Sequence, residues 1–192
     1  MATKVFSCGE MTSESVQNGV RSCRYFESDD KAAIYDGAFV NVGDLDLDGV
    51  YGLTTLDYNI HKATAPATGS LTREDICVID LAGIETWTKG TNTIKFGNKL
   101  VDLEIPAGEN ARFRTLHKRD NFWLGLGNFT AAPTVGKYAT VSNGSTKLTP
   151  SDTITASQFN VKILTSKALT VGQKVTSTGA SAYEQLYLVE VL

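Results

Sequence analysis

Val101-Asp102-Leu103-Glu104-Ile105 is the stretch that points most clearly to the class of fold. Its apolar side chains occupy the odd positions and its carboxylates the even ones. That period of two is expected of a β-strand with one buried and one solvated face. Pro106-Ala107-Gly108 follows at once and ends the strand. We expect residues 112–116 to be the return strand of a hairpin with it.

Other segments carry the same kind of signal. Residues 38–42 follow the turn pair Asp36-Gly37 and read as a strand. Residues 76–79 form an apolar run of the length expected for a strand buried on both faces. Asn143-Gly144 is a strong tight-turn signal. The closing residues 183–192 are apolar on both faces, which predicts a strand that is central in its sheet or covered by a partner.

Composition agrees with a β-rich globular chain. Among 192 residues there are 17 Gly and only 4 Pro, which suits short strands joined by tight turns, and no segment sustains helical periodicity. We therefore expect a mainly β protein, an antiparallel β-sandwich or small β-barrel preceded by an irregular N-terminal arm. The predicted organisation is an arm over residues 1–35 and a β-rich domain over 36–192. A mild boundary near 84–100 would divide that domain into two lobes.

The arm has two interpretations. Residues 1–35 show no sustained period, and their apolar side chains occur in isolated pairs such as Val5-Phe6 and Tyr25-Phe26. Aromatic side chains favour burial, so the segment is either an ordered arm that lies on a neighbouring subunit or a loosely held terminus.

The charge balance predicts no nucleic-acid partner. The formal net charge is -3, whereas a general nucleic-acid binder usually carries a basic surface. One basic cluster is bracketed by acidic residues, which predicts a solvated strand-and-turn face. The cluster consists of Arg112, Arg114, His117, Lys118 and Arg119.

Cysteine usage and the N-terminus predict a cytosolic origin. The 3 cysteines, Cys8, Cys23 and Cys77, are odd in number and form no Cys-x-x-Cys pair, so we expect free thiols in a reducing compartment. The first residues lack the apolar core of a secretory signal, and no apolar run is long enough to span a membrane. The expectation is a soluble protein with no membrane partner.

Asp44-Leu45-Asp46-Leu47-Asp48-Gly49 resembles the opening of a calcium loop, because carboxylates at alternate positions precede a glycine. The twelfth position of such a loop would be Thr55 instead of the bidentate glutamate that closes the site. We favour a strand-to-turn segment with Leu45 and Leu47 facing inward. A non-helical calcium loop built on Asp44, Asp46 and Asp48 is the alternative.

The sequence predicts no enzyme and no cofactor. His61 and His117 are far apart and lack metal-ligand spacing. The chain contains neither a Gly-x-Ser-x-Gly elbow nor a phosphate-binding glycine loop followed by a helix.

Two fragments carry a family resemblance: Tyr35-Asp36-Gly37-Ala38-Phe39-Val40-Asn41-Val42-Gly43, and the close from Val171-Gly172-Gln173-Lys174-Val175 to Tyr187-Leu188-Val189-Glu190-Val191-Leu192. With the layout of the whole chain, they resemble the head decoration (cement) and minor capsid proteins of tailed bacteriophages. The resemblance implies a virion protein on the capsid surface, assembled in the host cytoplasm. It would bind the major capsid protein and self-associate as a homotrimer or dimer.

The resulting hypothesis is a structural protein that stabilises a capsid shell by clamping neighbouring subunits. Apolar residues in the arm and the terminal strand would supply the interface, since lasting interfaces are hydrophobic. The predicted interface residues are Val5, Phe6, Tyr25, Phe26, Leu188 and Val191. The alternative is a tail or receptor-binding β-sandwich that binds carbohydrate, with Trp87, Trp123 and Tyr138 stacking on sugar rings.

Overall fold

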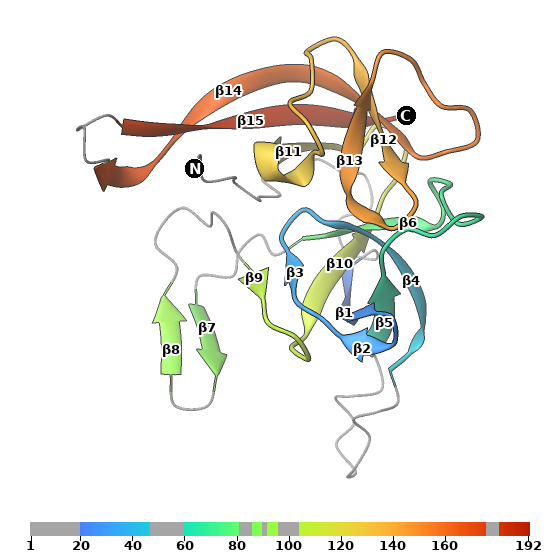
Figure 1. The fold of residues 1–192 in the computed structure, drawn as a ribbon, viewed down its shortest axis with the longest axis vertical. Coiled ribbons are helices and arrows are strands. Elements are labelled where there is room, and N and C mark those ends of the chain that lie inside the picture. The colour runs from blue at the N-terminus through green and yellow to red at the C-terminus, as the bar shows by residue number, and fades with distance from the viewer. Residues whose placement is uncertain (1–19, 47–59, 81–85, 90–91, 96–103, 176–180) are drawn as a thin grey trace.

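The fold is built almost entirely from β-strands, as the sequence predicts. The computed structural model describes residues 20–46, 60–80, 86–89, 92–95, 104–175 and 181–192. Within these ranges there is no α-helix, and the strands form a closed barrel, a curled sheet and two small two-stranded sheets (Figure 1).

The barrel is made by strands from the first two thirds of the chain. Its strands are β1 (Val20–Glu27), β4 (Phe39–Leu45), β5 (Ile60–Thr64), β6 (Ile76–Ile79) and β10 (Ala111–Thr115), and β2 (Asp30–Lys31) is added beside β1. The order is β10-β6-β4-β5-β1, and β1 pairs with β10 to close the ring. Four of these pairings are antiparallel, whereas β1 and β5 are parallel.

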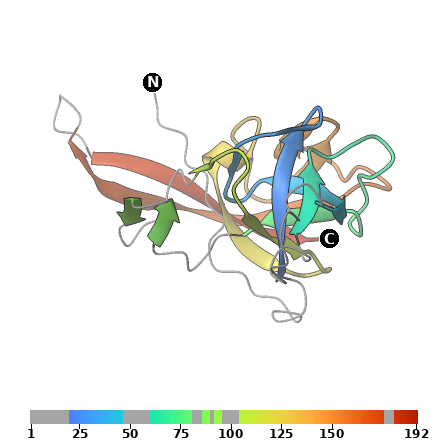
Figure 2. The ribbon, with the colours of Figure 1, turned by 90° about the horizontal axis from the view of Figure 1, so that it is seen from below.

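The curled sheet comes from the last third of the chain and covers the barrel (Figures 1 and 2). In sheet order its strands are β11 (Asn121–Gly125), β15 (Ser181–Val191), β14 (Asn160–Val175), β12 (Tyr138–Ser142) and β13 (Ser145–Ser151). A short 3₁₀ turn, η2 (Leu126–Asn128), follows β11. The small sheets pair β3 (Ile34–Tyr35) with β9 (Glu104–Ile105) and β7 (Thr86–Lys89) with β8 (Asn92–Lys95).

Strand β6 shows how the two layers share their packing. All four of its residues are buried. Ile76 and Val78 belong to the core between barrel and curled sheet, whereas Cys77 and Ile79 belong to the core inside the barrel. Because successive side chains of a strand point to opposite faces, a strand between two cores must be apolar throughout. This confirms the prediction of a strand buried on both faces.

A buried amide joins the two layers. The Asn128 side chain donates a hydrogen bond to the Asp36 carbonyl at 2.8 Å and accepts one from the Gly125 backbone at 3.1 Å. Gly37 lies against this amide with a φ of +73°, and a Cβ there would stand 2.6 Å from Nδ2 of Asn128. Glycine is therefore required at position 37 both for its backbone conformation and for space.

Three boundaries differ from the prediction. Residues 20–35 are not part of an irregular arm, because β1, β2 and β3 lie there; residues 1–19 fall outside the described residues. The change from barrel to curled sheet falls between β10 and β11, later than the predicted 84–100. β10 pairs with β1 and β6, and β9 pairs with β3, so the predicted hairpin of 101–105 with 112–116 does not form.

The turn and the terminal strand follow the prediction. Gly144 has a φ of +72° in the tight turn between β12 and β13. β15 lies between β11 and β14 and is therefore a central strand. Its buried face contributes Tyr187, Val189 and Val191 to the core between the layers.

Candidate assembly surface

The long hairpin of β14 and β15 extends beyond the rest of the curled sheet. β12 pairs with β14 only at its start, up to Lys162, and Ile163 makes the last backbone bonds with the loop before β12. β11 pairs with β15 only from Leu186 onward. Among the described residues, the backbone of the distal ribbon, residues 164–175 and 181–185, thus pairs only between its own two strands. Figures 1 and 2 both show it projecting from the body.

The distal ribbon is long and irregular. Residues 165–175 would span roughly 35 Å at about 3.3 Å per residue. The register between β14 and β15 shifts twice, between Ile163 and Thr165 and again between Thr170 and Val175. Register shifts of this kind increase local twist and bend a strand. Thr165, Lys167 and Ala168, at the base of the ribbon, are exposed.

A half-buried apolar pair lies on the outer face of the curled sheet beside that base. Trp123 of β11 is directly opposite Leu188 of β15, which is in turn opposite Thr165 of β14. The ammonium of Lys167 lies 4.0 Å from the centroid of the Trp123 ring. A cation at that distance occupies the ring face by which a tryptophan would stack on a sugar.

Of the aromatic residues of the carbohydrate hypothesis, Trp123 and Tyr138 do not lie on neighbouring strands. Tyr138 is on β12, and β14 and β15 lie between it and Trp123. The side chain of Trp87 lies outside what the structure describes. No specific observation therefore favours a sugar-binding platform.

The predicted interface residues are distributed between core and surface. Tyr25 and Phe26 are 4% and 6% exposed in β1, where the Lys62 ammonium lies 5.3 Å from the Phe26 ring. Val191 is fully buried, and Leu188 alone of the four described residues is half-exposed. Tyr25, Phe26 and Val191 are therefore buried within the chain itself and do not form a surface for a partner. Val5 and Phe6 lie outside the described residues.

Asp46 is held by an arginine. Its carboxylate is fully buried and lies 3.0 Å from Nη1 of Arg24, which also donates from Nε to Asn110. Leu45 is 38% exposed, so the predicted orientation is reversed here: the aspartate faces inward and the leucine outward. Asp48 lies outside the described residues. The Arg24 guanidinium thus already binds the Asp46 carboxylate, which a calcium loop would need as a ligand.

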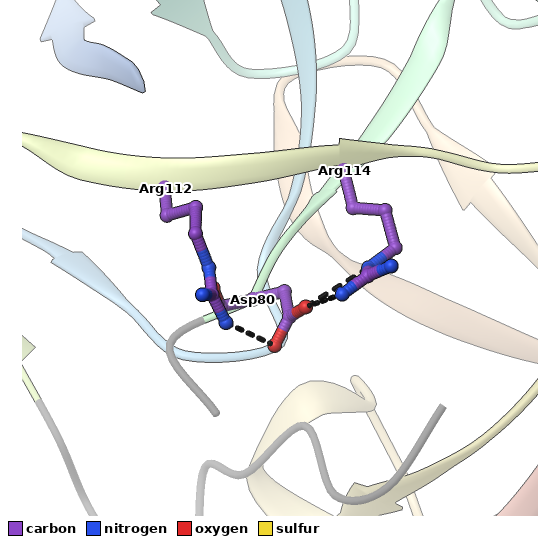
Figure 3. Close-up of polar contacts among 3 residues, drawn as sticks. All are labelled: Asp80, Arg112 and Arg114. Carbon is purple, nitrogen blue, oxygen red and sulfur yellow. Dashed lines mark hydrogen bonds and ion pairs between the residues drawn. The ribbon is translucent and has the colours of Figure 1, made fainter. Parts of the chain in front are cut away.

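A second buried carboxylate, Asp80, follows β6 and pairs with β10. Nε and Nη2 of Arg114 both bond to Oδ2 of Asp80, at 2.9 and 2.7 Å (Figure 3). Arg112 donates from Nε to the Asp80 carbonyl at 2.7 Å, and its Nη2 lies 3.4 Å from Oδ1. Asp80 is 2% and Arg114 9% exposed. The prediction that the basic cluster lies on a solvated face is thus wrong for Arg114. Its guanidinium is buried and paired with a carboxylate, as a buried charge requires.

One mouth of the barrel is hollowed. A hollow of about 310 Å³ is lined by residues that include Arg21, His61, Glu74, Cys77 and Phe113. His61 hydrogen-bonds through Nδ1 with the Gly43 carbonyl at 2.9 Å, and its ring meets that of Phe113 edge-on. Its lining combines acidic, basic and apolar groups, so its charge selects no ligand class.

The two described cysteines are buried free thiols inside the barrel. Burial raises the pKa of Cys23 to about 12, with a smaller contribution from Cys77, and burial raises the pKa of Cys77 to about 12. Both thiols are therefore protonated at neutral pH and poor nucleophiles.

Within the described ranges, no three His, Cys, Asp or Glu side chains gather closely enough to hold a metal ion. No helix in that part of the chain has the length and apolar character of a membrane span. His61 lies at the barrel mouth, whereas His117 lies 3.7 Å from Asp120 before β11, so the structure does not bring the two histidines together.

The distal ribbon is the feature that sequence reasoning missed. Strand β14 runs over 16 residues, which is longer than any strand that the sequence pattern predicts. One signal was present: the chain from 160 to 175 contains no proline and no Asn-Gly or Asp-Gly turn.

Comparison with known proteins adds no relative: no family model, curated protein or solved structure matches this chain.

Proposed function

We propose that this protein is a structural virion component that binds the outer surface of a phage capsid and stabilises the shell by clamping neighbouring subunits. The observation that carries the proposal is the distal ribbon. Among the side chains that the structure describes, the core between the layers takes none from residues 164–168 or from Gln185. A two-stranded ribbon is marginally stable alone in water, so a chain that keeps one beyond its core is equipped to bind another chain.

Co-sedimentation tests the proposal. Capsid shells, purified from the virus that encodes the chain and stripped of accessory proteins, are mixed with increasing amounts of the full-length protein and pelleted. We expect binding to saturate at a fixed number of copies per shell and the calorimetric melting temperature of the shell to rise. Binding that never saturates, or an unchanged shell melting temperature, would contradict the proposal.

A variant with a shortened ribbon tests whether the ribbon is responsible for binding. Ala168 is directly opposite Gln185, so replacing residues 169–184 by Asn-Gly closes the hairpin with a favoured two-residue turn. The deletion leaves the pairings with β11 and β12 intact. We expect this variant to fold but to lose saturable binding to the shell.

The arm contribution of Val5 and Phe6 needs a separate deletion. Removing residues 2–19 tests it and stops before β1, which begins at Val20. A longer deletion that removed β1 would open the barrel, because β1 joins β5 to β10. If the chain lacking residues 2–19 binds shells as the full chain does, the arm is not part of the interface.

A further inference from the structure

The Asn143-Gly144 turn combines a favoured backbone with reactive chemistry. The backbone nitrogen of the residue after an asparagine can attack the side-chain amide carbon, and a glycine there has no side chain to hinder the attack. Asparagine is accordingly scarcer in the proteins of hyperthermophiles. Both residues of this turn are exposed, so water can reach them. The pair therefore has the residue types and the solvent access of a deamidation site.

A loop of the barrel holds both groups that would react. The Gly144 backbone N–H, whose nitrogen is the nucleophile, donates to the Pro66 carbonyl at 2.7 Å. The Thr68 backbone N–H donates to Oδ1 of Asn143 at 2.9 Å, which fixes the amide under attack. Ring closure removes the Gly144 proton and brings the Asn143 amide carbon onto the Gly144 nitrogen, so both hydrogen bonds must be released. The reaction therefore requires the turn and the loop to separate.

The loop, residues 65–75, is itself fastened to the barrel by Asn41 of β4. Oδ1 of Asn41 accepts a hydrogen bond from the Ala67 backbone at 2.8 Å. Its Nδ2 donates to the carbonyls of Ser70 and Asp75, at 2.8 and 3.0 Å. Because three bonds converge on one side chain, the loop is held in place against the turn. Local opening of this contact costs free energy and is correspondingly infrequent.

We propose that Asn143 is a modification site whose deamidation proceeds only while the loop is open. The Gly144 nitrogen forms a bond with Cγ of Asn143, and its proton passes through water to the side-chain nitrogen, which leaves as ammonia. Water then opens the succinimide ring and gives aspartate or isoaspartate. Isoaspartate adds a carbon to the main chain of the turn, so the turn no longer matches the loop. Opening thus becomes a permanent change in the contact between barrel and curled sheet. This inference does not rest on the proposed function.

The reaction rate in the folded chain is the first test. The full-length protein and a synthetic peptide of residues 140–147 are incubated in the same neutral buffer, and deamidation is followed by mass spectrometry. Proteolytic fragments of the protein are resolved, because Asn18-Gly19 is a second Asn-Gly pair. Two hydrogen bonds of ordinary net strength should slow the reaction at Asn143 roughly 5- to 150-fold relative to the peptide. Equal rates overturn the proposal.

Thr68→Pro removes one of the two hydrogen bonds and suits the backbone of the loop. The Ser70 N–H donates to the Ala67 carbonyl at 2.9 Å, and Gly69 has a φ of +93°. This is a type II turn with Thr68 at its second position, where proline is favoured. Proline has no N–H to donate to Asn143. We expect deamidation to be roughly 2- to 13-fold faster in this variant than in the parent chain.

Val135→Pro is the matched control. The Lys137 N–H donates to the Thr134 carbonyl at 3.1 Å and Gly136 has a φ of +84°, so Val135 holds the same position in another type II turn. Among the described residues, none of the hydrogen bonds of that turn involves Asn143. We expect the control to deamidate at the parent rate.

Hydrogen exchange of the Gly144 amide keeps the proposal testable if Thr68→Pro is destabilised. Since one opening controls both reactions, the amide in the parent chain should exchange more slowly than in the peptide, by about the same factor as for deamidation. Exchange as fast as in the peptide overturns the proposal. A Thr68→Pro variant that keeps the parent's urea midpoint and deamidates no faster than the control overturns it as well.

Discussion

The ion pair of Asp80 and Arg114 offers the sharpest test of how the barrel is held together. In Asp80→Ala the carboxylate is lost, while the Arg114 guanidinium keeps its place on β10 with 11% of its side chain exposed. An arginine side chain stays charged at any ordinary pH, so it cannot avoid the cost of burial by losing its proton. The substitution therefore leaves a buried cation without its principal partner.

The expected loss of stability follows from burial. Removing one partner of a buried ion pair costs about 3–5 kcal/mol, which is a large part of the roughly 5–15 kcal/mol that stabilises a typical domain. Arg112 adds little, since its side chain is 36% exposed and exposed pairs contribute about 0–1 kcal/mol. Asp80→Asn keeps an oxygen that can accept from Arg114, so we expect it to cost about half as much as Asp80→Ala.

Urea unfolding at one fixed protein concentration, followed by tryptophan fluorescence, measures the effect. Asp152→Ala is the matched control, because Asp152 pairs with Lys137 at 3.4 Å while 85% of its side chain is exposed. We expect the control to lose at most about 1 kcal/mol and its loss to vanish in 1 M salt, whereas the Asp80→Ala loss persists there. If Asp80→Ala cost no more than the control, the assignment of a structural role to this buried pair would be wrong.

Two further predictions concern the barrel core and the contact between the layers. Because burial raises the pKa of Cys23 and Cys77 from 9.0 to about 12, the unfolded chain releases their protons at a lower pH than the folded chain does. Their contribution to stability is complete below about pH 9 and falls by about 1.4 kcal/mol per pH unit for each thiol up to about pH 12. Urea midpoints measured from pH 8 to pH 10.5 should show this fall, and Cys23→Ala should reduce its slope; an unchanged slope would count against the assignment. Gly37→Ala should cost more than Gly136→Ala in thermal melts. Both glycines have positive φ, but only at position 37 does a Cβ meet a neighbour, Asn128, within 3 Å; equal losses would mean that this amide moves aside freely.

Much of the strand content could be predicted because it depends on local alternation. Residues 76–79 are apolar throughout because β6 lies between two cores, and a strand in that position has no solvated face to mark with polar residues. The Asn143-Gly144 turn needs only the positive φ that glycine tolerates. The apolar terminal strand had to be central or covered, and β15 is central.

The interface residues and the basic cluster could not be placed from the sequence. Tyr25 and Phe26 look like candidates for a partner surface until β5 pairs in parallel beside them, a contact made across more than thirty residues of chain. Arg114 looks solvated because its carboxylate partner, Asp80, is 34 positions away. Alternation identifies the two faces of a strand but not which strands lie next to it.

The sequence by itself therefore determined that this protein is mainly β, that β6 is buried on both sides and that β15 is either central in a sheet or covered by a partner, because these properties depend on side chains close together in the chain. Only the tertiary structure decided that the first sheet closes through β1 and β10, that Asp46 and Asp80 face arginines, and that β14 and β15 continue past the core as a ribbon. The barrel closure and the two ion pairs depend on contacts between distant segments, whose free energy is not visible in the local pattern of either one. The ribbon is a hairpin of neighbouring strands, and only the position of β11 and β12 decides where it leaves the sheet.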